Sequence, residues 1–451
     1  MTGDVVVKAL AAACGDTREG TAADAIGADA VTSPAGPADP GGDAGRGGIV
    51  PAFVVAPGST DEAAAVLRAA AEHELAVVVR GAGGRIGWGV PPSRCDLMID
   101  MSRMSSVVEH SAGDLVARVQ AGARMGDVAA ALERDGQELA LDVPGEATIG
   151  GVVASGLAGP RRLRYGTPRD LLIGITIVRA DGTVARSGGK VVKNVAGYDL
   201  GKLLAGSAGT LALITDSTFR LHPLPAARVY VTAEYVSAGI ACDAVAAAAN
   251  SPLVASAVEL SRPSPGGPIG VGVLLEGSSE GVAARAMRMA DLLGPAETSL
   301  APPPWWRGAP SADGGTLIRV SCWVSALPTV LDAIAAAARD TGVSPAIEGS
   351  AGAGVLYLRL GADGGDGGAD GAVGGAGAAR ASAGFVRALR AARSGERGGV
   401  VVLAAPAAVR EALAGYGGMA GTVPSLALMR AVKDQFDPGH RMAPGRFPDL
   451  M

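Results

Sequence analysis

The chain contains the stretch Lys190-Val-Val-Lys-Asn-Val-Ala-Gly-Tyr-Asp-Leu200, which runs directly into Gly201-Lys-Leu-Leu-Ala-Gly206-Ser-Ala-Gly209-Thr-Leu-Ala-Leu-Ile-Thr215. Neither an amphipathic helix nor an alternating strand requires this order of residues. Its glycines let a backbone approach a ligand closely, and its Tyr, Asp, Asn and Lys side chains need polar partners. A short apolar strand is expected over Leu211–Thr215. The stretch therefore predicts a buried binding surface.

A second glycine-rich segment, Arg80-Gly-Ala-Gly-Gly-Arg-Ile-Gly-Trp-Gly89, follows an apolar segment that we predict to be a buried strand. Consecutive backbone N–H groups in such a loop can form a nest for phosphate oxygens. The dinucleotide motif Gly-x-Gly-x-x-Gly is excluded because residue 86 is isoleucine, and a Walker loop is excluded because no Gly-Lys pair is followed by Ser or Thr. By itself the loop supports two interpretations about equally, a phosphate-binding site and a tight turn between a strand and a loop.

A third cluster of small residues lies between Asp142 and Gly166 and includes Thr148-Ile-Gly-Gly151. Small residues recur there wherever a flat, wide ligand would press on the backbone. A glycine-rich surface loop is the alternative. That alternative is weakened by Val152, Val153 and Leu157, apolar side chains that favour burial.

Together these segments resemble the FAD-linked oxidases of the vanillyl-alcohol oxidase superfamily, whose FAD-binding domain is of the PCMH type. The glycine loop, Thr148–Gly151, Gly209–Thr215 and the tail Pro444-Gly-Arg446 occur in the superfamily's order. More narrowly, Gly156-Leu-Ala-Gly-Pro-Arg-Arg162 and Lys193-Asn-Val-Ala-Gly-Tyr-Asp-Leu200 are similar to the smaller FAD-binding subunit of bacterial glycolate oxidases. The resemblance covers residues 50–225 and 423–448, while residues between them match only in layout.

The resemblance implies a set of FAD-binding residues. Backbone N–H groups of the glycine loop would hold the pyrophosphate; these residues are Arg80, Gly81, Ala82, Gly83, Gly84 and Arg85. The third cluster would line the flavin ring and ribityl chain through Pro144, Gly145, Thr148, Gly150, Gly151, Ala154 and Ser155. The adenine side would be met by Gly209 and Ile214, and the flavin edge by Pro444 and Gly445 of the tail.

Other residues bear on this site less directly. Lys193, Asn194, Tyr198 and Asp199 would brace its wall from behind. The family usually carries Asn before the Pro-Gly of the tail, whereas this chain has Ala443, so a side-chain contact there is in doubt. Some members bond the flavin covalently through His or Cys near the glycine loop. Residues 74–94 contain neither, so we expect noncovalent FAD.

The resemblance and the residue patterns together predict an α+β fold, with a two-lobed FAD-binding domain, an α+β cap domain and a C-terminal tail returning to the flavin. We expect an N-terminal helix and flexible lead-in over 1–50, the FAD-binding domain over 51–225 with lobes at about 51–105 and 106–225, and a flavin-edge segment over 421–451. The cap would span 226–420, with a disordered Gly/Asp/Ala insertion at 361–377.

Local patterns predict the elements of these domains. A helix should begin at Ser59 or Thr60, whose side chains suit an N-cap before Asp61 and Glu62. A helix should also span the segment after Ser425. The remaining expected elements are a helix at 125–132 and strands at 52–55, 75–79, 96–100, 171–179, 229–235, 270–275, 316–323 and 355–360.

Composition narrows the function. Apolar residues make up 48% of the 451 residues, which favours a core-forming protein. A net charge of −5 and only 3% aromatic residues argue against a nucleic-acid partner. The four cysteines (Cys14, Cys95, Cys242 and Cys322) form no Cys-x-x-Cys pair, so we expect no metal site and a reducing cytoplasm. No apolar run is long enough for a transmembrane segment.

Oxidation of a 2-hydroxy acid requires a hydride acceptor, a base for the hydroxyl proton and a cation for the carboxylate. None of the four histidines lies in residues 226–420, where related catalytic dehydrogenases carry a His-rich site. Weak candidates for catalysis are His440, Tyr165 and Arg319, although a turn histidine and an ordinary ion-pairing arginine are the favoured interpretations. The Trp305-Trp306 pair either anchors a loop or marks a subunit contact.

Two functions therefore remain open. In the first, the chain is the FAD-binding subunit of a glycolate-oxidase-like 2-hydroxy-acid oxidoreductase, with a second FAD subunit and an iron–sulfur subunit as partners. It would then be cytoplasmic, or membrane-peripheral through that complex. In the second, it is a self-sufficient FAD-dependent dehydrogenase of the D-lactate or glycolate type. The missing cysteine motifs and cap histidines favour the first.

Overall fold

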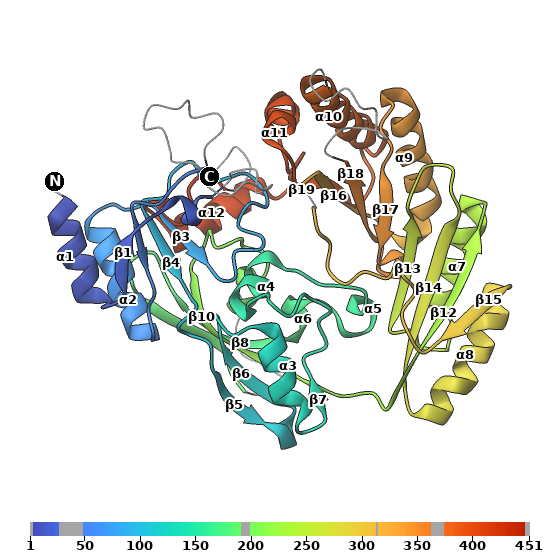
Figure 1. Ribbon diagram of the computed structural model, residues 1–451, viewed down its shortest axis with the longest axis horizontal. Helices are drawn as coiled ribbons and strands as arrows, with labels where there is room; N and C mark the ends of the chain where they lie inside the picture. The colour runs from blue at the N-terminus through green and yellow to red at the C-terminus, as the bar shows by residue number, and fades with distance from the viewer. Residues whose placement is uncertain (1–2, 27–47, 191–198, 313, 362–373, 447–451) are drawn as a thin grey trace. The chain divides into compact units, whose positions relative to one another are not determined.

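The computed structural model describes residues 3–26, 48–190, 199–312, 314–361 and 374–446. The chain divides into two compact units (Figure 1). Unit 1 comprises Met1–Leu157, Thr167–Leu224 and Val423–Met451, and unit 2 comprises Ala158–Gly166 and Pro225–Thr422. The C-terminal segment thus belongs to the same unit as the glycine loop. Residues 158–166, which the sequence places in the FAD-binding domain, instead cluster with the second unit.

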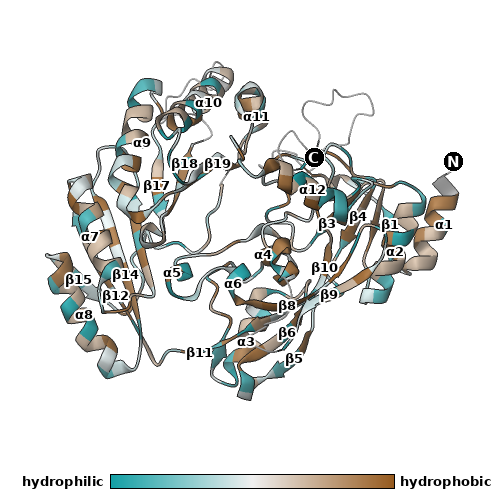
Figure 2. Ribbon diagram, turned by 180° about the vertical axis from the view of Figure 1, so that it is seen from behind, coloured by the Kyte–Doolittle hydropathy of each residue, from teal (hydrophilic) through white to brown (hydrophobic). Residues whose placement is uncertain are grey.

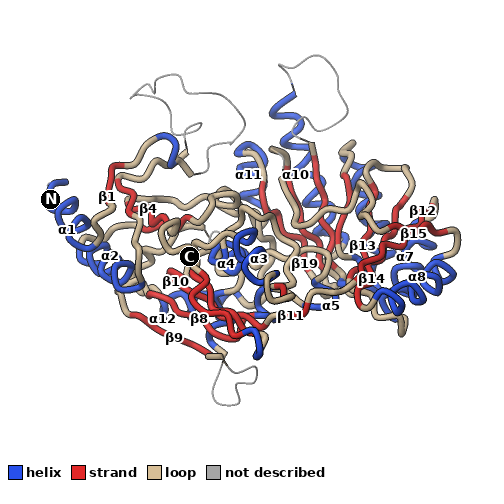
Figure 3. The backbone as a smooth tube through the Cα atoms, turned by 60° about the horizontal axis from the view of Figure 1, so that its bottom comes forward, coloured by secondary structure: helices blue, strands red, loops and turns tan. Residues whose placement is uncertain are grey.

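The first sheet of unit 1 has the strand order β1-β2-β4-β3, from Thr17–Glu19, Phe53–Val55, Leu97–Asp100 and Val77–Arg80. The β2, β4 and β3 strands are parallel, as the predicted βαβ start requires. Helix α2 (Thr60–Glu72) connects β2 to β3, and the Ser59 hydroxyl accepts the N–H of Glu62 at 3.1 Å, as expected of its N-cap. Helix α1 (Gly3–Ala13) packs beside α2 (Figure 3).

The second sheet of unit 1 is antiparallel, with the order β5-β6-β10-β8-β9. Its central strand β10 is longer than the strand predicted at 211–215. Helices α3, α4, α6 and α12 and the short pair β7 and β11 complete the described part of the unit. These elements are β5 (Val107–Ser111), β6 (Val116–Gln120), α3 (Met125–Glu133), β7 (Gln137–Glu138), α4 (Ile149–Ser155), α6 (Pro168–Leu171), β8 (Leu172–Val178), β9 (Val184–Gly188), β10 (Leu213–Arg220), β11 (His222–Pro223) and α12 (Leu426–Phe436).

A large apolar core lies in unit 1, with Phe219, Leu97 and Leu132 among its fully buried side chains. Brown, apolar strands lie in the middle of the unit in Figure 2, and teal marks outer sides of its helices. A buried Asp216 on β10 accepts two hydrogen bonds from the Arg118 guanidinium, at 2.8 and 2.9 Å. This pairing satisfies the buried carboxylate within the sheet.

Unit 2 is built on an eight-stranded antiparallel sheet with the order β15-β12-β14-β13-β17-β18-β16-β19. Helices α7, α8, α9 and α10 lie along one face of it (Figure 1). The elements are α5 (Arg162–Tyr165), β12 (Ala227–Tyr235), α7 (Ala238–Asn250), β13 (Ala257–Arg262), β14 (Ile269–Gly277), α8 (Ser279–Leu293), β15 (Ala296–Ser299), β16 (Thr316–Ser321), α9 (Leu327–Thr341), β17 (Ala346–Gly349), β18 (Val355–Leu360), α10 (Gly374–Ala392), β19 (Gly399–Ala404) and α11 (Ala407–Leu413).

The tryptophan pair is packed within unit 2. A Cβ atom at Gly272 of β14 would lie 2.7 Å from the Trp305 ring, so this strand position is open only because it is glycine. The ring of Trp306 meets Tyr230 of β12 edge to face, with 5.1 Å between centroids. Of the two roles left open by the sequence, these contacts support a loop anchored to the sheet.

Two sequence expectations are corrected. The flexible lead-in expected before residue 51 is wrong for residues 17–26, where β1 pairs with β2 and both Asp24 and Ile26 are buried; residues 27–47 lie outside the described residues. The predicted disordered insertion at 361–377 ends early, because helix α10 already begins at Gly374; its residues 362–373 lie outside the described residues. Both segments are rich in Gly and Ala, and that composition gives no local signal for strand β1 or for the start of helix α10.

Candidate functional site

The glycine loop begins where strand β3 ends, at Arg80. Gly83 has a φ of +80°, a left-handed conformation that glycine adopts without strain. The N–H of Ile86 donates to Gly83 O at 3.0 Å, which closes a turn. In the part of the chain that the structure describes, the N–H groups of residues 81–85 donate to no protein acceptor. This run of free donors can bind the oxygens of an anion.

The glycine loop lies against the residue that precedes helix α4. A Cβ atom at Gly81 would come 2.0 Å from the Thr148 Oγ1, so only glycine allows this approach. The Thr148 hydroxyl is buried and has no hydrogen-bond partner among the described residues. A buried hydroxyl without a partner is costly unless a ligand or water satisfies it. Two of the segments predicted to bind FAD thus meet here, with a donor available.

Helix α4 is fixed to the sheet by its backbone. The N–H groups of Ile149 and Gly150 donate to Ala123 O and Ala121 O at 2.9 and 2.8 Å. A Cβ atom at Gly150 would lie 2.8 Å from the Ala121 Cβ. Gly150, which the resemblance places in the flavin-binding set, therefore has a packing role that the sequence did not reveal.

The segment predicted to meet the adenine lies beside α4. Ala208 N–H donates to Ala154 O at 2.7 Å, and Gly209 follows with a φ of +74°. The Ser207 hydroxyl is buried without a partner among the described residues. Ile214 is in strand β10 and pairs with Ile177 of β8. The hydrogen bond between Ala208 and Ala154 thus joins the segment before Gly209 to helix α4.

The C-terminal tail runs along the edge of the first sheet. Its Ala443 N–H donates to Val77 O at 2.8 Å, and Ser93 N–H donates to Pro444 O at 2.7 Å. The Arg446 guanidinium donates to Ile86 O in the glycine loop. Pro444 and Gly445 are thus beside that loop. The Ala443 side chain is buried in a small apolar cluster, so the family's Asn position faces the core here.

Two half-buried arginines, Arg85 in the glycine loop and Arg446 beside it, form no salt bridge with any described residue. Burial lowers the pKa of Arg446 to about 10 and lowers that of Arg85. The Arg85 guanidinium lies 5.3 Å from the centre of the Trp88 ring. The charge of Glu146 offsets this effect only in part at Arg85, so an anionic ligand would further stabilise both cations. A dinucleotide pyrophosphate carries that charge, so the site fits FAD.

A buried ion pair that the sequence did not predict lies against Thr210, in the segment predicted to meet the adenine. The Lys433 ammonium donates to Asp437 Oδ2 and to Thr210 O, both at 2.6 Å, and to Met442 O at 3.0 Å. Lys433 is 2% exposed, and burial lowers its pKa. The signal was available: Lys and Asp stand four residues apart at the end of an otherwise amphipathic helix.

The residues predicted to brace the wall are only partly visible. Lys193, Asn194 and Tyr198 lie outside the described residues. Asp199 is exposed and pairs with Lys202 at 3.4 Å, so it has no packing role. That expectation is corrected for Asp199.

The three weak catalytic candidates are divided between the two units. His440 is half-exposed in unit 1 and pairs with Asp434 at 3.0 Å, in a turn where its φ is +49°. Arg319 is exposed on strand β16 of unit 2. Tyr165, also in unit 2, donates its hydroxyl proton to Glu276 Oε2 at 3.1 Å.

Glu276 is a buried anchor for the segment 158–166. Besides Tyr165 it accepts hydrogen bonds from Arg161 at 3.3 Å and Arg228 at 2.9 Å. Burial by itself would raise the pKa of Glu276, but the charges of these arginines hold it below its ordinary value. Burial and the Glu276 carboxylate raise the pKa of Tyr165 to about 12. At neutral pH this phenol is a hydrogen-bond donor and a poor base.

The thiol nearest the glycine loop in sequence is Cys95. It is buried in the same apolar cluster as Ala443, and burial raises its pKa to about 12. Such a thiol is a poor nucleophile toward a flavin. Among the described residues, no group of His, Cys, Asp or Glu could hold a metal ion. In the same residues, no helix combines the length and apolarity needed to cross a bilayer.

Comparison with known proteins identifies this type of domain. Residues 51–188 match a family model described as FAD binding domain. The chain is 35% identical over 198 residues to glycolate oxidase subunit GlcD of Bacillus subtilis, covering 44% of this chain and 42% of that protein. It is 37% identical over 161 residues to glycolate oxidase subunit GlcE of Escherichia coli, covering 35% of this chain and 45% of that protein.

These matches span less than half the length of either relative. Among solved structures, p-cresol methylhydroxylase with substrate bound superposes on 98% of this chain and 96% of its own, with a TM-score of 0.70 at 16% identity. That likeness shows the fold. Residues 51–188 are therefore an FAD-binding domain, and FAD is the cofactor of this chain.

Proposed function

We propose that this chain is the FAD-binding subunit of a glycolate-oxidase-like complex that oxidises a 2-hydroxy acid to the 2-oxo acid. Its similarity to two glycolate oxidase subunits supports this proposal. A second FAD subunit and an iron–sulfur subunit would be its partners, in the cytoplasm or at a membrane surface reached through the complex. A 37% identity over 171 residues to a D-lactate dehydrogenase of Archaeoglobus fulgidus favours the alternative, a self-sufficient dehydrogenase.

In this proposal the free N–H groups of residues 81–85, together with Arg85 and Arg446, hold the pyrophosphate. FAD, when bound, accepts the hydride released from the substrate carbon. The flavin and ribityl contacts come from the turn before α4 and from α4 itself, and the adenine contacts from the segment that Lys433 fixes. Pro144, Gly145, Thr148, Gly151, Ala154, Ser155, Gly209, Ile214, Pro444 and Gly445 complete the proposed site. FAD is bound noncovalently.

The observation that carries the choice of a subunit is the state of Tyr165. A base must accept the substrate's hydroxyl proton, yet the Tyr165 hydroxyl already donates to Glu276 and keeps its proton up to about pH 12. His440 is engaged with Asp434 at the surface. A base supplied by a partner subunit is consistent with this arrangement.

The test is anaerobic reduction of the isolated chain. We expect its bound flavin to remain oxidised when glycolate or D-lactate is added, with no loss of absorbance near ~450 nm. Dithionite, which reduces flavins chemically, is the control that the bound flavin can be bleached. Bleaching by either hydroxy acid would contradict the subunit proposal and establish the self-sufficient dehydrogenase.

A further inference from the structure

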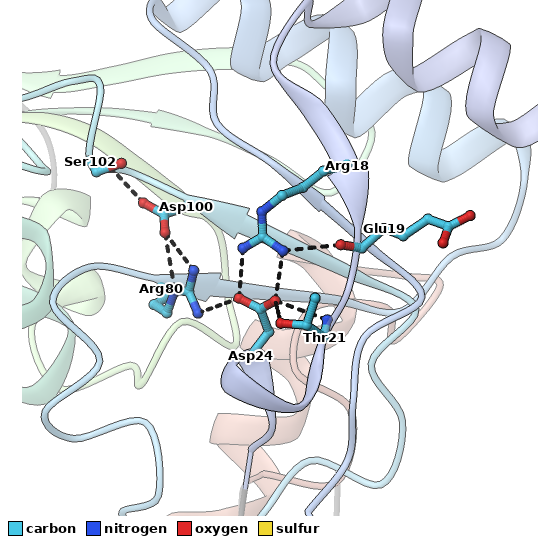
Figure 4. Close-up of polar contacts among 7 residues, drawn as sticks. All are labelled: Arg18, Glu19, Thr21, Asp24, Arg80, Asp100 and Ser102. Carbon is cyan, nitrogen blue, oxygen red and sulfur yellow. Dashed lines mark hydrogen bonds and ion pairs between the residues drawn. The ribbon is translucent and has the colours of Figure 1, made fainter. Parts of the chain in front are cut away.

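An acidic residue of the N-terminal segment lies between two arginines (Figure 4). Asp24 Oδ2 and Oδ1 accept hydrogen bonds from the Arg18 guanidinium at 2.7 and 2.8 Å, and Oδ1 also accepts one from Arg80 at 2.9 Å. Asp24 is only 3% exposed. The arginine partners, Arg18 first, hold the pKa of its carboxyl well below the usual range. Asp24 is therefore a buried anion at neutral pH.

The N-terminal segment presents Asp24 through its own local structure. Strand β1 pairs with β2, and the short 3-10 helix Ala22–Asp24 follows it. Thr21 donates both its backbone N–H and its hydroxyl to Asp24 Oδ2, each at 3.0 Å. Each carboxylate oxygen of Asp24 thus accepts more than one hydrogen bond, which fixes its position.

Arg80 connects this segment to the glycine loop. It is the last residue of β3 and directly precedes Gly81. Its guanidinium donates to Asp100 Oδ2 from Nε at 3.1 Å and from a terminal nitrogen at 2.7 Å, and its other terminal nitrogen donates to Asp24. All three nitrogens are engaged with carboxylates. Arg80 therefore acts on the loop by fixing where it begins.

We propose that Asp24 is a positioning residue for FAD: through Arg80 it holds the start of the phosphate-binding loop, so that FAD binding and ordering of residues 17–26 are coupled. The inference rests on the proposed placement of the pyrophosphate at residues 81–85. Coupling between two sites is reciprocal, so bound FAD must also slow amide hydrogen exchange in residues 17–26. Residues 17–26, expected from the sequence to be part of a flexible lead-in, would thus act as a clamp on the cofactor site.

The test replaces Asp24 with Asn and compares it with Glu19→Gln, which removes a charge from the same segment. The Glu19 carboxylate points away from Asp24 in Figure 4, so this variant should bind FAD as the wild type does. Loss of a charge-assisted hydrogen bond at Asp24 should weaken FAD binding to the apoprotein by about tenfold, measured by flavin fluorescence. Arg18→Gln should give a smaller loss in the same direction, and it provides the test if Asp24→Asn does not fold.

Hydrogen exchange separates positioning from a loss of stability. FAD should slow amide exchange over residues 17–26 in the wild type and in Glu19→Gln, but not in Asp24→Asn or Arg18→Gln. The inference would be overturned if Asp24→Asn and Arg18→Gln both bind FAD with unchanged affinity. It would also be overturned if FAD does not change the amide exchange rates of residues 17–26 in the wild type. If a substitution at Gly81 weakens binding while these variants do not, only the role of Asp24 fails. If Gly81 is also without effect, the proposed pyrophosphate site itself is wrong.

Discussion

Gly81→Ala is expected to weaken FAD binding by at least about tenfold, because tenfold corresponds to about 1.4 kcal/mol and overpacking costs about 1–3 kcal/mol. The added Cβ would lie 2.0 Å from the Thr148 Oγ1. Thr148 cannot move far, since the two residues after it are hydrogen-bonded to the turn that follows strand β6. The loop must therefore shift, and its free N–H groups move away from the pyrophosphate. Flavin fluorescence titration of the apoprotein measures the loss.

A second substitution should restore binding. In Gly81→Ala/Thr148→Ala the clashing hydroxyl is gone, and the new Cβ would lie 3.1 Å from the Cβ of residue 148, which a small shift accommodates. The double variant should bind FAD more tightly than Gly81→Ala, and Thr148→Ala completes the cycle. Equal affinities for Gly81→Ala and the wild type would show that this close approach does not shape the site.

Lys433→Met is expected to lower the stability of unit 1 by about 3–5 kcal/mol, because it leaves the Asp437 carboxylate buried without its cation. Asp437 is 0% exposed, so water cannot replace the lysine at the surface. Two backbone acceptors, Thr210 O and Met442 O, also lose their donor. The first unfolding transition on heating should fall by on the order of 10 °C, measured by circular dichroism.

Lys202→Met is the matched control. Lys202 forms an exposed pair with Asp199 at 3.4 Å, and exposed pairs contribute about 0–1 kcal/mol. Its melting temperature should stay close to that of the wild type. If Lys433→Met has the same melting temperature as Lys202→Met, the buried pair does not hold the segment around Thr210 and the C-terminal tail together.

The sequence predicted the parts of the fold that depend on local pattern. The strands around Val54, Val78 and Ile99 are short apolar runs between turn residues, and Ser59 is a good N-cap, so these elements lie close to where expected. Strand β1, Thr-Arg-Glu, has no apolar alternation, and it forms because β2 offers it an edge. Propensity alone does not find such a strand.

Contacts between residues far apart in the sequence could not be predicted. The glycine segments of the site were found because their composition is unusual, and the structure brings the loop, Thr148 and the tail together. The segment 158–166 clusters with the second unit, and one of its contacts there is between Arg161 and Glu276, 115 positions away. Asp24 and Arg80 are likewise 56 positions apart. A single sequence contains no signal for such pairs.

The most direct measurement is the flavin content of the purified chain, before and after denaturation. We predict one FAD per chain, with absorbance near ~450 nm. Acid precipitation of the protein should release this FAD intact into the supernatant. This result would place a noncovalent dinucleotide in the domain formed by residues 51–188. A chain that takes up no FAD, or flavin that stays bonded to the denatured polypeptide, would contradict it.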